Sequence, residues 1–224
     1  MDRGKGEGLK NTMPKILKVE YRESHVVLAL DDGEELKLPL NLAGLHGLAA
    51  DREIDPVQYR DIRDESDLFC CREKALSYLA PRARSVFEMK TYLRKKGFSA
   101  PAIESVVGAL VDKGYLDDGA YALALIQSKM RKKAMGPALL KKELAARGIA
   151  RGTIDRAIRE SGAAEADPDV VYAAARKKFD SLKGGDERLG RVYRFLLQRG
   201  FRHEDAKKAL GRIRDESCPD ADAE

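Results

Sequence analysis

The sequence has no tryptophan, few other aromatic residues, and little cysteine or histidine. Aromatic residues make up 6% of its 224 residues, and there are only three cysteines and three histidines. So few large rings favour thin helical layers over one large globular core. Cys70 and Cys71 are neighbours that cannot bridge comfortably, so no disulfide framework is predicted. No histidine stands at metal-ligand spacing from a cysteine or another histidine, so we expect neither a metal site nor another cofactor.

Long apolar runs and catalytic motifs are also missing. No apolar stretch reaches the roughly 18 residues that indicate a membrane-spanning helix, and the first residues, MDRGKGEGLK, lack the apolar core of a signal peptide. We therefore predict a cytoplasmic protein. No phosphate-binding glycine loop and no nucleophile elbow is present, and the adjacent Asp117 and Asp118 stand where a helix cap is expected. We expect a protein that is not an enzyme.

The sequence does contain a repeat. A turn of the form Leu-x-x-x-Gly followed by Phe or Ile occurs at residues 93–98, 144–149 and 196–201, so its copies are 51 and 52 residues apart. Apolar residues follow each turn in the same register, and an amphipathic segment precedes each pair of helices. One such apolar stripe is formed by Ile103, Val106, Val107, Leu110 and Val111. Each copy therefore indicates a three-helix module.

The predicted fold is mainly α. We expect three tandem three-helix repeats, at residues 69–118, 119–166 and 167–214, that form an elongated, curved solenoid and act as a monomer. Residues 1–12 and the acidic tail 215–224 (DESCPDADAE) have little apolar content and are expected to be disordered.

A small antiparallel β segment is predicted before the repeats, within residues 13–68. Strand-like runs occupy residues 16–21, 25–30 and 35–40, and Asp32-Gly33 indicates a type I′ hairpin turn. Residues 41–55 are expected to be irregular or a short helix. A helix then begins at Pro56 behind the cap Asp55, and we expect a break near residues 64–67 before Pro81 ends the leading helix of the first module.

Glycine, proline and aspartate mark the later helix boundaries. Residues 114–118 (GYLDD) end one helix with glycine and cap the next with an aspartate, which leaves Tyr115 and Leu116 to pack between modules. Tyr121 is also expected to pack. Gly136-Pro137 opens the middle helix of module two, and Asp167-Pro168 opens module three.

Charge is distributed unevenly along the chain. Residues 1–70 hold 10 basic and 15 acidic side chains, residues 71–214 hold 32 and 17, and the last ten hold none and 5. The net charges are therefore −5, +15 and −5. A helical array at +15 attracts polyanions, and the acidic tail can compete for the same surface.

Three groups of basic residues are candidates for binding a filament or DNA. Runs of charge on helices are usually solvated faces, but the asymmetry of the whole chain is a stronger signal than any one cluster. Without interleaved exposed aromatic residues, they suggest phosphate contact of low sequence specificity. The candidates are Arg94, Lys95, Lys96, Lys129, Arg131, Lys132, Lys133, Lys141, Lys142, Arg147, Arg188, Arg191 and Arg194.

Sequence-specific DNA reading by these paired helices is weakly supported. The second helix of module one offers Glu104, Ser105 and Asp112 where a major-groove helix needs Arg, Asn or Gln. Arg151, Arg156 and Arg159 of module two leave that possibility open.

Residues 75–158 contain a set of specific motifs: Arg84-Ser85 with Glu88, the turn at residues 96–98, GYLDD at 114–118 with Tyr121-Ala122, and Gly136 leading to Glu143-Leu144. With these motifs the segment closely resembles the RecX family of bacterial recombination regulators. The resemblance is looser in module three, where Ala206 and Ala209 are smaller than their counterparts. The amino-terminal strands depart from the plain three-module members.

The resemblance implies a modulator of the RecA recombinase that is not an enzyme. RecX-like proteins consist of tandem three-helix modules and bind the RecA–DNA filament along its groove, which reduces ATP hydrolysis, strand exchange and filament growth. The implied partners are the RecA nucleoprotein filament and single- or double-stranded DNA, and the implied processes are DNA repair, recombination and the SOS response. A general DNA-binding helical-repeat protein without RecA specificity is the alternative, and an uncharacterised scaffold is a third.

Overall fold

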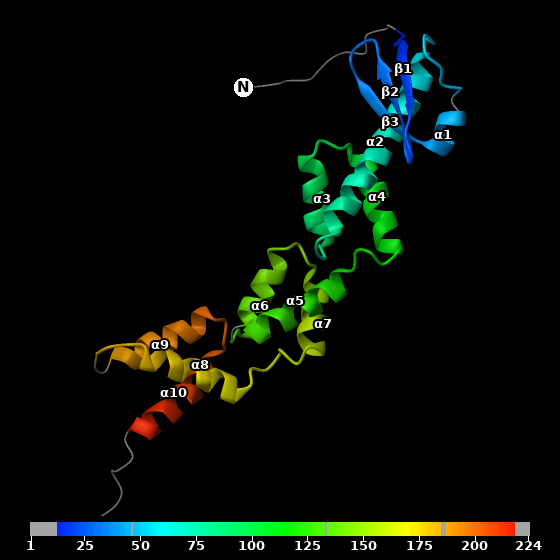
Figure 1. Cartoon of the computed structure of the whole chain (residues 1–224). Coiled ribbons are helices and arrows are strands. Elements are labelled where there is room, and N and C mark those ends of the chain that lie inside the picture. The colour runs from blue at the N-terminus through cyan, green and yellow to red at the C-terminus, as the bar shows by residue number, and fades with distance from the viewer. Residues whose placement is uncertain (1–12, 46, 133, 185–186, 218–224) are drawn as a thin grey trace, which may run out of the picture. The chain divides into compact units, whose positions relative to one another are not determined.

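The structure is a computed structural model that describes residues 13–45, 47–132, 134–184 and 187–217. The described residues form three strands and ten helices, which Figure 1 shows in chain order. Their contacts divide them into two compact units. One unit holds residues 13–82 and 89–115, and the other holds residues 83–88 and the described residues from 116 onward.

The amino-terminal sheet is the predicted antiparallel meander. Strands β1 (Ile16–Tyr21), β2 (His25–Leu30) and β3 (Glu35–Pro39) lie in the order β1-β2-β3. The predicted type I′ turn is wrong, because only Gly33 in the Asp32-Gly33 pair has a positive φ, +84°. The Gly33 amide donates to the Leu30 carbonyl at 3.1 Å, so the hairpin closes through a turn followed by one left-handed glycine.

One face of the sheet packs against the long helix that follows. Alternating strand residues point to that face because successive side chains of a strand alternate in direction. Ile62 of α2 completes this core together with Ile54 from the loop, and both are fully buried. The strand residues of the core are Ile16, Val26, Leu28, Leu30, Leu36 and Leu38.

Helix α2 (Pro56–Leu79) continues without a break, which corrects the break predicted near residues 64–67. Asp55 caps its start by accepting the amides of Val57 and Gln58. The polar stretch inside it is held by neighbouring segments: Ser66 Oγ accepts the Lys37 amide at 2.8 Å, and Asp67 accepts the Ser99 amide at 3.1 Å. The short helix α1 (Leu40–Leu45) agrees with the prediction for residues 41–55.

The first module consists of the end of α2 with α3 (Val86–Lys95) and α4 (Ala100–Asp112). The rings of Tyr78 on α2 and Tyr92 on α3 stack at 3.9 Å. Ser99 caps α4, and the predicted apolar stripe of α4 is buried except for Val111, which is 43% exposed. Helix α4 therefore buries a stripe one residue narrower than predicted.

The second and third modules are also confirmed as three-helix groups. Module two comprises α5 (Asp118–Lys132), α6 (Pro137–Ala145) and α7 (Arg151–Glu160), around a core of their apolar residues. Module three comprises α8 (Pro168–Asp180), α9 (Glu187–Gln198) and α10 (His203–Ser217). Ala206 and Ala209 are buried there despite their small size. The described residues 215–217 are helical, although residues 215–224 were expected to be disordered. The rest of that tail and residues 1–12, for which disorder was also predicted, lie outside the described residues.

The segment between α4 and α5 contains Tyr115 and Leu116, which were both predicted to pack between modules. Leu116 and Tyr121 are buried as expected, but Tyr115 is 63% exposed, so its predicted packing role is wrong. Asp117 caps α5 by accepting the amides of Gly119 and Ala120 at 2.7 and 3.0 Å. Capping by one aspartate of the pair is therefore confirmed.

Candidate polyanion interface

The end of α3 carries the first candidate group. Arg94 and Lys95 lie in its last turn and Lys96 follows it, where the negative end of the helix dipole favours cations. All three side chains are exposed. Lys96 Nζ lies 5.6 Å from the ring centroid of Tyr92. Among the described residues none of the three has an acidic partner, so this group keeps its full positive charge.

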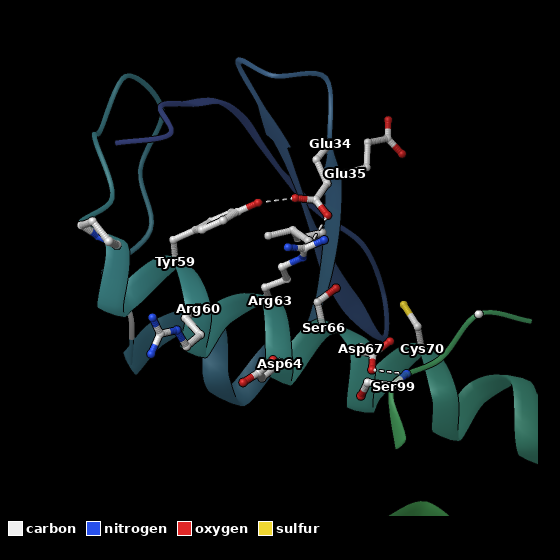
Figure 2. Close-up of a pocket in the computed structure, with 13 residues that line it drawn as sticks. Glu34, Glu35, Tyr59, Arg60, Arg63, Asp64, Ser66, Asp67, Cys70 and Ser99 are labelled. Atoms are coloured by element: carbon white, nitrogen blue, oxygen red, sulfur yellow. Dashed lines mark hydrogen bonds and ion pairs between the residues drawn. The ribbon is translucent and has the colours of Figure 1, made fainter. Parts of the chain in front are cut away.

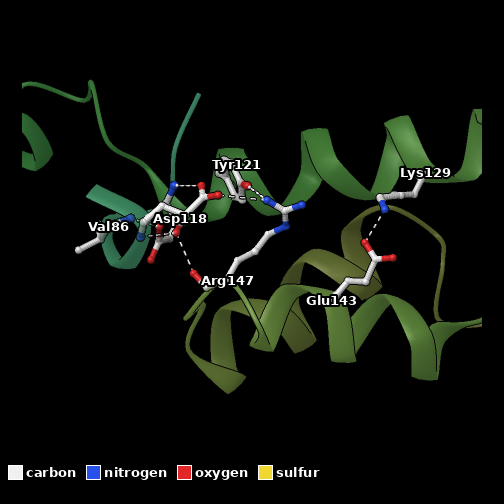
Figure 3. A network of polar contacts seen from close by, with 8 residues as sticks. Val86, Asp118, Tyr121, Lys129, Glu143 and Arg147 are labelled. Atoms are coloured by element: carbon white, nitrogen blue, oxygen red, sulfur yellow. Dashed lines mark hydrogen bonds and ion pairs between the residues drawn. The ribbon is translucent and has the colours of Figure 1, made fainter. Parts of the chain in front are cut away.

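In module two, two of the five candidate lysines are held by carboxylates. Lys129 Nζ lies 2.6 Å from Glu143 Oε2, a contact between α5 and α6 that Figure 3 shows. Lys141 Nζ lies 2.6 Å from Asp155 Oδ1, and this bond and the nearby charge hold the pKa of Asp155 below its ordinary value. Both lysines are therefore largely neutralised within the protein.

Two other cations of module two are exposed and, as far as the structure describes the chain, have no acidic partner. These are Arg131 on α5 and Lys142 on α6. Lys132 is the last residue of α5, and Lys133 lies outside the described residues. Module two thus offers solvent fewer positive charges than its sequence contains.

Arg147 joins two segments of the protein. Its Nη1 lies 3.2 Å from Glu88 Oε1 and donates to the Tyr121 hydroxyl at 2.8 Å, as Figure 3 shows. Its carbonyl accepts the Ser85 hydroxyl at 2.7 Å. Both charged side chains are partly buried, with 31% of Arg147 and 18% of Glu88 exposed. This arrangement gives Arg147 a structural role, whatever else it contacts.

Asp118 belongs to the same network. Its Oδ1 accepts the amide of Val86, the first residue of α3, at 2.9 Å. The carboxylate therefore caps a helix that begins 32 residues earlier in the chain. This role could not be read from the sequence, because nothing local marks a partner so distant.

The arginines of α9 differ from one another in their surroundings. Arg188 stacks on Phe179 of α8, with its Cζ 4.3 Å from the ring centroid. Arg191 pairs with Glu187 one turn earlier at 3.1 Å, and Arg194 donates to the Gly190 carbonyl at 3.4 Å. The spacing of three residues predicted that these arginines lie along one helix face. Among them, only Arg194 is exposed and has no acidic or aromatic partner among the described residues.

Aromatic rings between the cations of module three are the feature that the sequence analysis missed. The ring of Phe195 on α9 contacts Lys178 at 5.7 Å and Arg199 at 5.1 Å, and the ring of Phe179 contacts Arg188 and Arg176. Two of these contacts have helical spacing, i to i+3 for Arg176 and Phe179 and i to i+4 for Phe195 and Arg199. The sequence spacing could therefore have predicted these two cation–aromatic contacts.

The described residues contain no group of three or more His, Cys, Asp or Glu side chains that could hold a metal ion. The Cys71 thiol is buried, and burial raises its pKa to about 11. Burial also raises the pKa of Cys70. Neither thiol is therefore activated as a nucleophile. Within the described residues, no helix is both long and apolar enough to span a membrane.

Family models match all three modules. Residues 71–110, 117–158 and 165–210 match the first, second and third three-helix domains of RecX. These segments cover more than half of the chain. The chain belongs to the RecX family. The match to the third RecX domain includes the module in which the sequence resemblance was looser.

Curated relatives named regulatory protein RecX agree with this assignment. The RecX of Halalkalibacterium halodurans is 35% identical over 159 residues, which span 69% of this chain and 59% of that relative. The chain thus covers less than two thirds of that relative's length. The RecX of Streptococcus pneumoniae strain Hungary19A-6 is 25% identical over 199 residues, or 89% of this chain and 77% of the relative.

Two solved structures share the RecX fold. A crystal structure of regulatory protein RecX matches with a TM-score of 0.67 and 20% identity, over 87% of this chain and 98% of its own. The RecX structure from Lactobacillus salivarius matches with a TM-score of 0.58 and 20% identity, over 66% and 96%. At this identity the likeness supports the fold alone.

Proposed function

We propose that this protein regulates RecA by binding the RecA–DNA filament and inhibiting its ATPase, strand exchange and filament growth. Membership of the RecX family supports the proposal, because RecX-like proteins are modulators of RecA. The relatives are themselves named regulatory proteins. The proposed site is the set of basic side chains on the three modules.

The proposal rests on the positive charge that remains when the cations paired with acidic side chains inside the protein are excluded. Each module keeps exposed cations with no acidic partner within the described chain. Such cations can contact phosphates of filament-bound DNA or acidic protein surface without first breaking an internal ion pair. Among the candidates they are Arg94, Lys95, Lys96, Arg131, Lys142 and Arg194.

The proposed regulation requires no catalytic group. A protein shifts an equilibrium between filament states when it binds one state more tightly than the other. Binding across neighbouring RecA subunits would favour one filament state in this way. We therefore propose that the protein is a binding regulator and not an enzyme.

The test is the ATPase activity of RecA on single-stranded DNA with the protein added well below the RecA concentration. The proposal expects ATP hydrolysis to fall while free DNA remains available. The variant Arg131→Glu/Lys142→Glu should inhibit more weakly. Lys37→Glu/Arg60→Glu, which reverses two exposed cations of the amino-terminal segment that also have no acidic partner among the described residues, is the matched control and should inhibit like the unaltered protein. Full inhibition by the module-two variant would remove these two residues from the site.

General DNA binding is the alternative, and the cation–aromatic contacts of module three favour it. Stacked rings and basic groups are the elements that bind single strands without sequence preference. Under this alternative, inhibition appears only when the protein saturates the DNA, and extra unlabelled DNA relieves it. Inhibition that persists after such addition supports the filament as the target.

A further inference from the structure

The turns after the three middle helices are equivalent, but one of them is uncovered. Gly97, Gly148 and Gly200 have φ of +88°, +73° and +80° at matching places in the repeat. A Cβ on Gly148 would lie 2.2 Å from the Phe87 Cβ, and one on Gly200 would lie 2.3 Å from the Leu139 amide nitrogen. At Gly97 nothing in the described structure lies within 4 Å of that position. The first turn therefore lacks the cover that the other two have.

The covering segments use equivalent hydrogen bonds. Ser85, just before α3, donates its hydroxyl to the Arg147 carbonyl at 2.7 Å. Gly136, just before α6, donates its amide to the Arg199 carbonyl at 2.8 Å. In each case the residue that precedes a middle helix bonds to the carbonyl before the next module's turn glycine. The matching carbonyl in the first turn belongs to Lys96, and it accepts no hydrogen bond from the described residues.

The uncovered turn borders a groove. Figure 2 shows this groove, which has a volume of about 760 Å³ and is lined by the start of β3, by α2 and by the turn at Gly97 and Ser99. Its volume falls within the range of ~300–1,000 Å³ that is typical of ligand-binding pockets. All of these residues lie in one compact unit, so the groove is a feature of that unit alone.

The walls of the groove are acidic on balance. Glu34 and Asp67 are occupied, because Glu34 accepts the Tyr59 hydroxyl at 2.6 Å and Asp67 accepts the Ser99 amide. The carboxylates of Glu35 and Asp64 are exposed and have no partner among the described residues. Arg63 lies 3.4 Å from Glu34, which leaves Arg60 as the one lining arginine without a described acidic partner. The groove lining therefore has two available carboxylates and one available cation.

We propose that this groove binds the start of a basic helix from a partner protein, as the second and third turns bind the starts of α3 and α6. The incoming segment would donate a cap-residue hydrogen bond to the Lys96 carbonyl and place a large side chain over Gly97. Its cations would lie near Glu35 and Asp64. The positive end of its helix dipole adds to this attraction. The proposal does not depend on RecA being the partner, so it can fail or succeed separately from the proposed function.

The test uses a peptide with the sequence of residues 82–91, RARSVFEMKT, because this segment already covers an equivalent turn. It is titrated into the full-length, ¹⁵N-labelled protein while backbone amide shifts are recorded. Saturable changes at Asp64, Gly97 and Ser99 are expected. The variant Glu35→Lys/Asp64→Lys should weaken the binding about tenfold, because each reversal replaces an attraction by a repulsion.

Matched controls separate the groove from general electrostatics. Glu23→Lys/Asp61→Lys reverses two exposed charges of the same unit outside the groove, and it should leave peptide affinity unchanged. A peptide carrying Ser85→Ala should bind more weakly because it lacks the hydroxyl donor. The proposal is overturned if a scrambled peptide gives the same shifts, if the changes appear only around Gly148, or if no saturable change is seen.

Discussion

Modules two and three hold their basic side chains in different ways. In module two the partners are carboxylates, as for Lys129 with Glu143 and Lys141 with Asp155. In module three several partners are aromatic rings, as for Arg188 on Phe179 and Arg199 on Phe195. A carboxylate neutralises the cation that it binds, whereas a ring orients the cation and leaves its charge in place. Module three also has carboxylate pairs, at Arg176, Arg191 and Arg212. The comparison therefore applies to Lys178, Arg188 and Arg199, which contact rings and have no acidic partner among the described residues.

Modules two and three meet in a close backbone contact, which we call the joint, between the start of α6 and the turn before α10. Gly136 at the start of α6 and Gly200 in the turn before α10 approach so closely that a Cβ on Gly136 would lie 2.1 Å from the Gly200 carbonyl oxygen. The joint thus depends on close backbone contact, and the cation contacts lie outside it. This separation makes the joint and the cations independently testable.

The largest effect is expected when the joint itself is overpacked. Gly136→Ala should lower the free energy of unfolding by about 2–3 kcal/mol, because backbone atoms must move to admit the methyl group. Gly190→Ala, in the interior of α9 with open space around it, should instead stabilise by up to about 1 kcal/mol. Urea unfolding of both variants measures this contrast. Equal effects would show that the joint is not tightly packed.

The next largest effect is the difference in stability loss between removing an arginine held by a carboxylate and removing one held by a ring. Arg147→Met removes a charged hydrogen bond and leaves Glu88 partly buried, so it should destabilise by about 1.5–3 kcal/mol. Arg188→Met removes a contact with Phe179 and should destabilise by only about 0.5–1 kcal/mol. Thermal unfolding of the two variants ranks them. A larger loss for Arg188→Met would reverse the comparison.

For DNA binding, unlike stability, we expect the loss of ring-held cations to have a larger effect than the loss of carboxylate-paired cations. Lys178→Gln/Arg199→Gln removes two charges that rings leave active, and it should weaken binding to a labelled single strand about tenfold at low salt. Lys129→Gln/Lys141→Gln removes two charges already paired inside the protein, and it should weaken binding about threefold or less. Fluorescence anisotropy measures both affinities. Equal losses would contradict the distinction between paired and ring-held cations.

The smallest effect concerns the pH dependence of one ion pair. The hydrogen bond from Lys141 holds the folded-state pKa of Asp155 below its ordinary value of 3.8. The unfolded chain therefore binds this proton more readily. The stability that the pair contributes is present above pH 3.8 and is lost as the pH falls through the folded-state pKa. An NMR titration of the Asp155 carboxyl should give a midpoint below 3.8, and Lys141→Met should raise it.

Local sequence signals predicted the repeat but not the contacts between its parts. The turn glycines, the cap at Asp117 and the buried stripe of α4 are determined by residues a few positions apart, and these predictions are confirmed except for the exposed Val111. The break in α2 was predicted from the length of an unbroken helix, but segments distant in the sequence hold Ser66 and Asp67 within one continuous helix.

The roles of single charged residues were harder to predict for the same reason. Arg147 was chosen for its charge, yet Glu88, 59 residues away, lies against its guanidinium. Arg188 was expected on an open helix face, yet part of its guanidinium, the Nε atom, is buried beside Phe179. Composition and helical periodicity report how many charges a module holds. They do not report which charges are satisfied by contacts across the fold.

The measurement that tests the proposed function most directly is the length of RecA filaments on single-stranded DNA, seen by electron microscopy with and without this protein. The account predicts shorter filaments at protein concentrations well below that of RecA, and weaker shortening by the Arg131→Glu/Lys142→Glu variant. Filaments of unchanged length, with the protein coating only DNA that RecA has left bare, would contradict it.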